Sequence, residues 1–255
     1  MKRVRVIGTG SYLPEKILTN FDLEKMVDTN NDWIIARTGI EQRRIAAETE
    51  NTSDLATKAA ERALEMAGVT PEEIDLIVMG TITGDYPWPA TACIVQNNLG
   101  AKNAYAYDIS AACSGFVYAL SSAADFLEAG RGKKALVIGS EILSRVVDWS
   151  DRNTCVLFGD GAGAVVLDLQ EGDSGILSSH MHSDGSYLEL LYQPGFATKN
   201  QATPEAVADK SNYSLVMQGN EVFKVAVRSL TEVSREALAA NNLSTKDVSL
   251  FIPHQ

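Results

Sequence analysis

The chain contains few of the residues from which disulfide frameworks and metal sites are built. Its 255 residues include three cysteines, at positions 93, 113 and 155, and three histidines. The cysteines are odd in number, widely spaced and never paired as C-x-x-C, so neither a disulfide scaffold nor a zinc site is indicated. The sequence also lacks a G-x-S-x-G motif, which disfavours a serine hydrolase.

Long hydrophobic runs and an excess of basic residues are missing as well. The N-terminal segment 1-MKRVRVIGTGSYLP-14 is basic, but glycines and polar residues interrupt it too early for a signal peptide. No stretch approaches the roughly eighteen apolar residues of a membrane-spanning helix. The formal net charge of -11 argues against binding to nucleic acid or to an anionic membrane surface, and we expect a cytoplasmic protein.

What is present is an ordinary globular composition and an internal repeat. Of all residues, 45% are apolar and 22% are charged, which suits one large domain or two small ones. The segments 62-RALEMAGVTPEEIDLIVMG-80 and 236-EALAANNLSTKDVSLFIPH-254 align without a gap. Each predicts a helix end, a chain-reversing stop, an N-cap and a buried strand. The corresponding positions are Gly68 and Asn242 for the stop, Thr70 and Ser244 for the N-cap, and 74–79 and 248–253 for the strand.

The helices expected before these strands carry apolar residues at helical spacing. We therefore predict an α/β protein made of two copies of one unit, residues 1–172 and 173–255. The alternative is that any two helix-turn-strand segments of an α/β protein look alike. The second copy stops where the first continues, which favours a fragment of a longer chain over an abbreviated half. The apolar positions are Leu55, Ala59, Ala63 and Met66 in the first copy and Val222, Ala226, Leu230, Val233 and Ala237 in the second.

The first copy continues with further segments of strand character. We predict strands at 134–140, 154–160 and 162–169, the last two as a hairpin-like pair. The glycine-rich run 159-GDGAGA-164 is followed by strand-like residues and not by a helix, so we interpret it as close backbone packing between the two halves and not as a phosphate-binding loop. Residues 193–212 are polar and lack periodicity, which predicts a long surface loop.

Strand character changes to helix character within 108-DISAACSGFVYALSSAADFLEAG-130. Cys113 lies at that change, so we expect it at or near a helix N-terminus. The unpaired N–H groups and the positive dipole end found there favour an anion, so a thiolate forms more easily than in mid-helix. The alternative is a buried cysteine that acts as a small hydrophobic residue.

Six stretches, in their order and spacing, resemble the β-ketoacyl-acyl-carrier-protein synthase III family, the initiating condensing enzymes of type II fatty acid synthesis. The resemblance implies a thiolase-like fold, a five-layered αβαβα sandwich of two similar halves, of which the second is incomplete in this chain. This fold agrees with the internal repeat. The stretches are 7-IGTGSYLPE-15, 32-DWIIARTGI-40, 108-DISAACSGF-116, 157-LFGDGAGA-164, 218-QGNEVFKVAV-227 and 252-IPHQ-255.

The resemblance makes Cys113 the nucleophile that takes an acyl group from coenzyme A, and His254 a catalytic base or hydrogen-bond donor. Because equivalent strands of two related halves end on the same side, residues near those ends can converge. A histidine there can keep a thiol ionised and stabilise an enolate oxygen. Outside the family a lone histidine after a strand is more often structural, as we expect of His180 and His182. The family's third catalytic residue, an asparagine, would follow Gln255.

Further positions match the family's coenzyme A site. Trp33 and Arg152 match the pair that holds the adenine, and Arg37 matches a phosphate contact. The alternative is that such arginines merely cover apolar surface. Gly219 and Phe223 match positions that line the pantetheine tunnel.

Trp88 matches a position that closes the acyl pocket across a homodimer interface. A bulky side chain there leaves little room, which predicts a preference for short primers. The alternative is an exposed loop tryptophan between two prolines. Lys224, Arg228 and Gln255 are expected to contact the acidic carrier protein.

The implied activity is decarboxylative condensation of a short acyl-CoA, such as acetyl-CoA, with malonyl-acyl carrier protein to give a 3-oxoacyl product. Acyl-CoA is then a substrate, and no cofactor or metal is expected. The alternatives are a thiolase-fold acyltransferase of secondary metabolism and a non-catalytic acyl-CoA-binding paralogue. Without the asparagine and a glycine-rich segment that completes the oxyanion site, the chain as written is expected to perform at best the first half-reaction.

Overall fold

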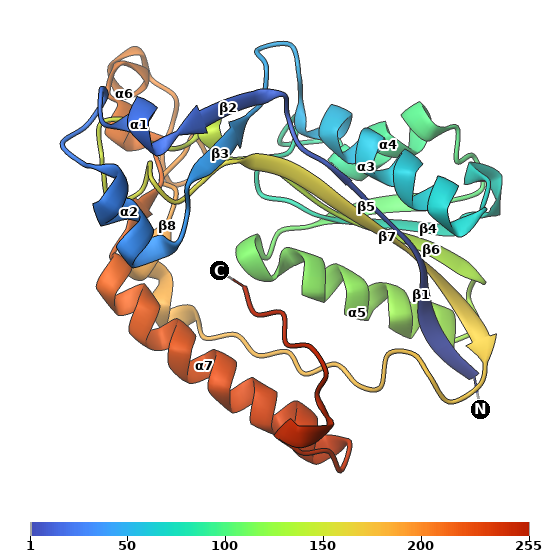
Figure 1. Cartoon of the computed structure of the whole chain (residues 1–255). Coiled ribbons are helices and arrows are strands. Elements are labelled where there is room, and N and C mark those ends of the chain that lie inside the picture. The colour runs from blue at the N-terminus through green and yellow to red at the C-terminus, as the bar shows by residue number, and fades with distance from the viewer. Residues whose placement is uncertain (1, 255) are drawn as a thin grey trace.

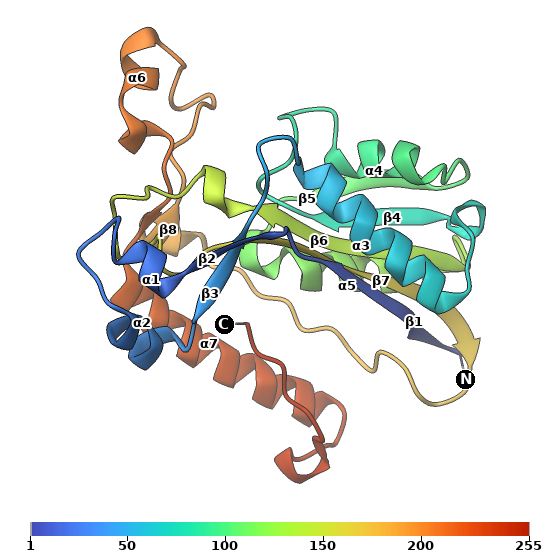
Figure 2. The same ribbon diagram turned by 45° about the horizontal axis from the view of Figure 1, so that its top comes forward.

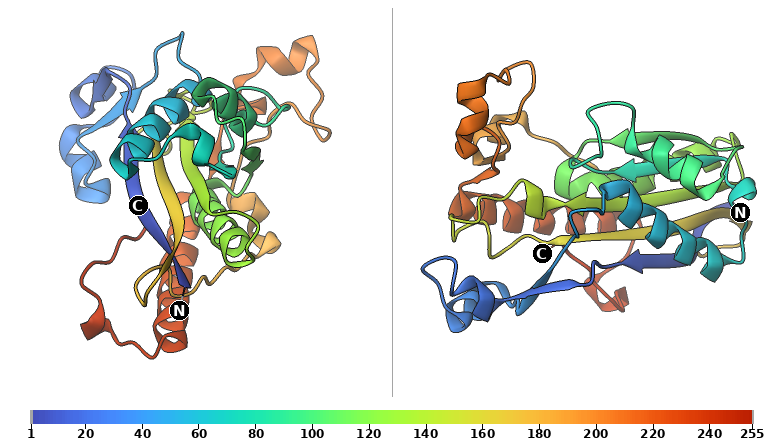
Figure 3. Two further views of the ribbon diagram at one scale, coloured as in Figure 1. Left: turned by 90° about the vertical axis from the view of Figure 1, so that its right-hand side faces the viewer. Right: turned by 90° about the horizontal axis from the view of Figure 1, so that it is seen from above.

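The computed structural model describes residues 2–254, in which five strands form a central mixed sheet (Figure 1). Their order across the sheet is β1-β7-β6-β4-β5. β4 is parallel to both of its neighbours, whereas β7 is antiparallel to both of its own. The long strands β1 and β7 run side by side, as Figure 3 also shows. The strands are β1 (Lys2–Tyr12), β4 (Leu76–Gly80), β5 (Tyr105–Ile109), β6 (Lys134–Ile142) and β7 (Asp160–Glu171).

Helices cover both faces of this sheet. α3 (Thr52–Ala67) and α4 (Thr91–Leu99) lie on one face, and α5 (Gly115–Glu128) lies on the other (Figure 1). Every residue of β4 is buried, because a strand with helices on both faces has no side toward water. The strands predicted at 74–79 and 134–140 are thereby confirmed as β4 and β6.

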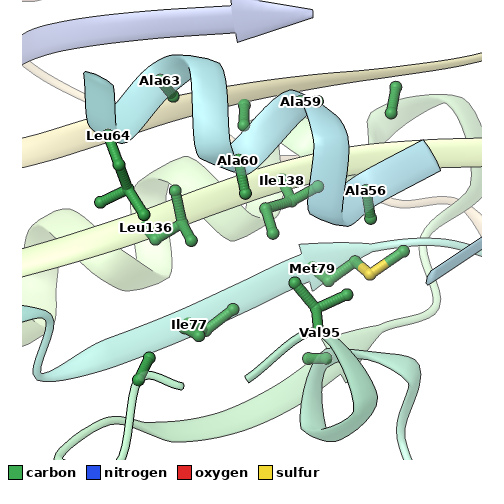
Figure 4. Packing of buried hydrophobic residues seen from close by; sticks show 14 of the residues in the cluster. Ala56, Ala59, Ala60, Ala63, Leu64, Ile77, Met79, Val95, Leu136 and Ile138 are labelled. Atoms are coloured by element: carbon green, nitrogen blue, oxygen red, sulfur yellow. The ribbon is translucent and has the colours of Figure 1, made fainter. Parts of the chain in front are cut away.

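Alternation along β4 builds two separate cores. Ile77 and Met79 pack with the alanine-rich face of α3 and with Val95 of α4 (Figure 4). Leu76 and Val78 point the other way and pack with residues of α5. Successive side chains of a strand point to opposite faces, so one buried strand serves both cores.

A smaller unit precedes α3 in the chain. β2 (Lys16–Thr19) pairs with β3 (Gln42–Ile45), and the connection between them contains α1 (Asn20–Leu23) and α2 (Asn31–Thr38). Arg43 of β3 is 5% exposed and donates hydrogen bonds to the Asn20 side chain at 3.0 Å and to the Val156 carbonyl at 2.9 Å. A Cβ on Gly159 would lie 2.9 Å from Cβ of Arg43, so this glycine packs closely on β3 of the same half, and the predicted packing between halves is not seen at this residue.

The chain after β7 forms fewer regular elements. β8 (Leu191–Tyr192) pairs with β9 (Val216–Met217), and the long helix α7 (Gly219–Ala240) follows. The loop predicted at 193–212 is not entirely irregular, because it contains α6 (Pro204–Ala208) and the short 3₁₀ helix η5 (Lys210–Asn212). Figure 2 shows that α6 projects away from the sheet.

The structure confirms the local features of the repeat. Gly68 and Asn242 both adopt the left-handed conformation, with φ of 64° and 54°. Thr70 and Ser244 each begin a 3₁₀ helix with a capping box, η1 (Pro71–Glu73) and η6 (Thr245–Asp247). The same stop and the same cap therefore follow α3 and α7.

Four expectations about these elements are wrong. Residues 248–253 are not a strand, because a strand needs a hydrogen-bonded neighbour and these residues have none within the described chain. Residues 154–157 form turns, so the predicted hairpin reduces to the single strand β7. Met66 is 66% exposed although it was expected on the buried face of α3. The apolar stripe of α7 is only half-buried.

No helix in residues 2–254 has both the length and the apolar character needed to cross a membrane.

Candidate active site

Cys113 lies in a 3₁₀ turn, η2 (Ala112–Ser114), between the end of β5 and the start of α5. Its expected position at a helix N-terminus is therefore confirmed. Ala112 has a φ of 46°, a left-handed conformation that residues other than glycine rarely adopt. The turn leaves the Cys113 side chain exposed, which excludes a buried hydrophobic cysteine.

Backbone contacts fix the start of α5 against the sheet. A Cβ on Gly80, the last residue of β4, would lie 2.5 Å from the carbonyl carbon of Gly115. A Cβ on Gly115 would lie 3.2 Å from Cα of Gly80. The contact excludes a side chain at position 80 and is tight at position 115, so main chain packs directly on main chain below the turn that carries Cys113.

The electrostatic environment of Cys113 differs from the expectation. Although the Cys113 side chain is exposed, the protein around it partly desolvates the sulfur and so raises the pKa of the thiol, and the charge of Glu141 acts in the same direction. A hydrogen bond from the Cys113 backbone acts in the opposite direction. The net shift is upward, opposite to the shift expected from the helix terminus.

His254 is exposed, and within the described residues it forms no hydrogen bond or ion pair with Cys113. The structure therefore does not join the two residues that the family pattern pairs. The predicted strand that was to carry His254 toward Cys113 is absent.

Trp33, Arg37 and Arg152 come together, as the resemblance implies for the adenine site. The guanidinium carbon of Arg37 lies 4.4 Å from the Trp33 ring centroid, and that of Arg152 lies 5.2 Å from it. Asn30 caps the start of α2 by accepting from the Trp33 N–H at 2.8 Å. Arg152 donates to the carbonyl of Asp28 at 2.8 Å. Both guanidinium groups are therefore within cation–π distance of the indole.

The other predicted ligand contacts lie apart from this cluster. Trp88 is 83% exposed in the loop before α4. Gly219 is the first residue of α7, where an added Cβ would lie 3.5 Å from the Met217 methyl, and Phe223 is 69% exposed. These three residues are exposed and do not line one pocket within the described chain.

The predicted carrier-protein contacts lie on α7. Lys224 pairs with Glu221 at 2.7 Å, and Arg228 donates to the Tyr187 hydroxyl at 2.7 Å. Both are exposed. Gln255 lies outside the described residues.

An open cleft of about 440 Å³ separates α5 from α7 and reaches Ser114, next to Cys113. One wall contains Glu236, whose carboxylate binds His180 at 3.0 Å and His182 at 2.6 Å. These hydrogen bonds lower the pKa of Glu236. Tyr118 of α5 donates to the carbonyl of His182 at 3.0 Å, so the histidine segment bridges the two helices. This arrangement agrees with a structural role for both histidines.

Two acidic residues near Cys113 were missed by sequence reasoning. Asp108 caps α4 by accepting from the N–H groups of Thr91 at 2.6 Å and Ala92 at 2.8 Å. Glu141 accepts four hydrogen bonds from the loop after β4. Glu141 follows the buried Ser140, and an acidic residue near the end of a buried strand was the available signal, whereas Asp108 lies in the half-buried strand β5 and gave no such signal.

Within residues 2–254, no three or more His, Cys, Asp or Glu side chains are grouped so that they hold a metal ion.

Comparison with known proteins places the chain in a family. The profile of 3-oxoacyl-[acyl-carrier-protein] synthase III matches residues 107–185. The β-ketoacyl-[acyl-carrier-protein] synthase III of Caldanaerobacter subterraneus is 52% identical over 98% of this chain and 75% of its own length. The crystal structure of 3-oxoacyl-[acyl-carrier-protein] synthase III from Aquifex aeolicus has a TM-score of 0.88 and 51% identity over 97% of this chain and 75% of that one.

A third relative comes from a different pathway. The priming β-ketosynthase of the R1128 polyketide biosynthetic pathway has a TM-score of 0.85 and 38% identity, and the match covers 96% of this chain and 72% of that one. The high identity over nearly the whole chain decides the assignment. The chain has the thiolase-like fold and belongs to the β-ketoacyl-acyl-carrier-protein synthase III family of condensing acyltransferases.

Proposed function

We propose that this protein acts in the initiating condensation of fatty acid synthesis, from a short acyl-CoA and malonyl-acyl carrier protein, and that the residues described here carry its first half-reaction, the formation of acyl-Cys113. The observation that carries the proposal is an exposed thiol at the start of α5, in the stretch that the family profile matches. Cys155 is buried, and Cys93, which is also exposed and lies in the first turn of α4, is outside the residues 107–185 that the family profile matches.

The chemistry has two stages. The Cys113 sulfur attacks the thioester carbonyl of the acyl-CoA, the bond from that carbon to the coenzyme A sulfur breaks, and the leaving thiolate takes up the proton that Cys113 released. Malonyl thioester then loses carbon dioxide, and its α-carbon forms a bond to the acyl carbon. Cleavage of the acyl–Cys113 bond returns the thiolate. His254 is proposed to donate a hydrogen bond to the enolate oxygen of this second stage.

The binding roles rest on the exposed side chains described above. Trp33, Arg37 and Arg152 are proposed to hold the adenine and a phosphate of coenzyme A, which the stacked arginines support. Gly219 and Phe223 at the start of α7 are proposed to line the path of the pantetheine. Lys224 and Arg228, with Gln255, are proposed to face the acidic carrier protein.

We further propose a cytoplasmic homodimer that binds neither nucleic acid nor membrane. β5 lies at an edge of the sheet, where its outer side is unpaired within the described chain. Trp88 follows β4, the neighbour of β5, and its 83% exposure suits a side chain that enters a partner's acyl pocket. The ratio of acetyl to octanoyl transfer by Trp88→Ala tests this role, because an unchanged ratio contradicts it.

The two halves proposed from the repeat are residues 1–172 and 173–255. Matching capping boxes at Thr70 and Ser244 support this division.

A related acyltransferase of secondary metabolism is a second candidate function, which the likeness to the R1128 priming ketosynthase favours. Release of carbon dioxide on addition of malonyl-acyl carrier protein to the acylated protein distinguishes the first candidate from the second.

Mass spectrometry after incubation with acetyl-CoA tests the intermediate. We expect one acetyl group on Cys113 and none on the Cys113→Ala variant. Cys93→Ala is the matched control, because Cys93 is also exposed but its Sγ–H donates to the Ala106 carbonyl at 3.4 Å within α4 packing. Full labelling of Cys113→Ala contradicts the proposed nucleophile.

A further inference from the structure

Trp88 lies in the tip of the loop that joins β4 to α4, residues 81–90. Tyr86 and Trp88 in this tip are 63% and 83% exposed. The residues at its two ends are not exposed, since Asp85 is half-buried and Thr91 has no exposed surface. A side chain on a loop keeps a defined place only where contacts with the rest of the fold hold the main chain of that loop. The contacts of Asp85 and Thr91 therefore determine how firmly Trp88 is presented.

Asp85 fastens one end of the tip to the start of α3. Its carboxylate accepts from the N–H of Ser53 at 2.8 Å and from the Ser53 hydroxyl at 2.6 Å. Ser53 is the second residue of α3 and is 3% exposed. The N-terminus of a helix favours a carboxylate, and hydrogen bonds to an ionised acceptor are stronger than neutral ones. Asp85 is therefore bound at two points to a buried residue that lies 32 positions earlier in the chain.

The same residue is joined to the other end of the tip through its main chain. The N–H of Asp85 donates to the hydroxyl oxygen of Thr91 at 3.1 Å. The N–H of Thr91 donates to the carboxylate of Asp108 at 2.6 Å, which fixes this end to β5. A Cβ on Gly84 would lie 2.6 Å from the Thr91 hydroxyl oxygen, so the two ends also pack closely. Asp85 thus connects the tip to α3 by its side chain and to α4 by its main chain.

The start of α3 does not depend on Asp85 for its cap. Asp54 in the first turn of α3 accepts from the N–H of Asn51 at 2.8 Å, as the acidic residue of a capping box does. The helix is also packed on β1, β6 and β7. The bonds between Asp85 and Ser53 therefore restrain the loop more than they restrain the helix.

We propose that Asp85 is a positioning residue that determines specificity: by fastening the loop to α3 it fixes the base of the tip, so that Trp88 closes the acyl pocket against long chains. The inference rests on the proposed role of Trp88 in that pocket. Asp85 touches no substrate and acts through the main chain that it shares with Trp88. When the bonds to Ser53 are lost, the tip can yield, and an acyl chain longer than a short primer should be admitted at a lower cost.

The test measures the transfer of octanoyl and of acetyl groups from coenzyme A to Cys113 by mass spectrometry, as the ratio of the two rates. Asp85→Ala removes both acceptors for Ser53 and should raise the octanoyl-to-acetyl ratio by about three- to tenfold. Asp54→Ala is the matched control, because it removes a carboxylate from the same helix start without touching the loop, and it should leave the ratio unchanged. In protein that already carries Trp88→Ala, Asp85→Ala should raise the ratio no further, because residues that act as one unit are not additive.

Equilibrium unfolding in urea shows whether each variant is folded. If Asp85→Ala is not folded, Asp85→Asn replaces it, because the amide keeps the shape of the side chain but has a single accepting oxygen. An unchanged ratio in the variant at position 85, an equal rise in Asp54→Ala, or a full further rise on top of Trp88→Ala overturns the proposal. Failure of the proposed function is seen separately, as wild-type Cys113 that takes up neither acyl group or as a ratio that Trp88→Ala leaves unchanged.

Discussion

The helices α3 and α7 occupy equivalent places in the sequence repeat, but only α3 is part of a core. Leu55, Ala59 and Ala63 of α3 have no exposed surface, whereas no residue of α7 is buried. α3 packs on β1, β6 and β7, while residues 248–253 after α7 have no strand neighbour in the described chain. The repeated sequence therefore specifies the helix, the residue that ends it and the cap that follows, all by local interactions. Burial of the helix, in contrast, requires a neighbouring sheet on which it can pack.

The largest difference in stability between α3 and α7 is expected when one leucine of each helix is replaced by alanine. Leu55→Ala should lower the free energy of unfolding by about 3–5 kcal/mol, because it leaves a cavity between α3 and the sheet. Leu230→Ala in α7 should cost about 1 kcal/mol or less, because Leu230 is only half-buried. Equilibrium unfolding in urea measures both changes. Equal losses would show that α7 packs as tightly as α3.

Smaller changes in the free energy of unfolding are expected at the two chain reversals, and the two changes should have opposite signs. Gly68→Ala places a side chain at φ 64° and should cost about 1–2 kcal/mol, although the site has open space around it. Asn242→Gly relieves the same conformation at φ 54° and should stabilise by up to about 1 kcal/mol. Thermal unfolding of both variants compares them, and destabilisation by Asn242→Gly would contradict the equivalence of the two reversals.

The smallest effect concerns the two capping boxes. Hydrogen bonds from Thr70 and then Lys134 lower the pKa of Glu73, and hydrogen bonds from Ser244 lower that of Asp247. A carboxyl group whose pKa is lower when folded stabilises the protein above its unfolded pKa, and this contribution disappears as the pH falls through the folded pKa. Both carboxyl groups should therefore titrate below their usual ranges by NMR. Ser244→Ala should raise the midpoint of Asp247 and leave that of Glu73 unchanged.

Most of the first core was predictable from the sequence. β4 and β6 are continuous apolar runs, and the positions of Gly68 and Thr70 follow from local backbone rules. Residues 248–253 show the same pattern but form no strand, because pairing is a property of two segments. The apolar pattern of 154–160 failed for the same reason.

The candidate site was predictable where one local signal sufficed. Cys113 follows from the change of pattern after β5, and the contact of Trp33 with Arg37 follows from helical spacing. The raised pKa of Cys113 was not predictable, because its causes are burial and a glutamate on a different strand. The family pattern likewise says nothing about the four donors on Glu141.

The contact between Gly80 and Gly115 has a consequence for how the site can change. Since two stretches of main chain meet without an intervening side chain, the sulfur keeps its place when the surrounding side chains are exchanged. The side chains around the proposed nucleophile are therefore free to diverge while Cys113 stays in place. The same contact makes position 80 intolerant, because a Cβ there would lie 2.5 Å from the main chain of Gly115 and push the start of α5 away.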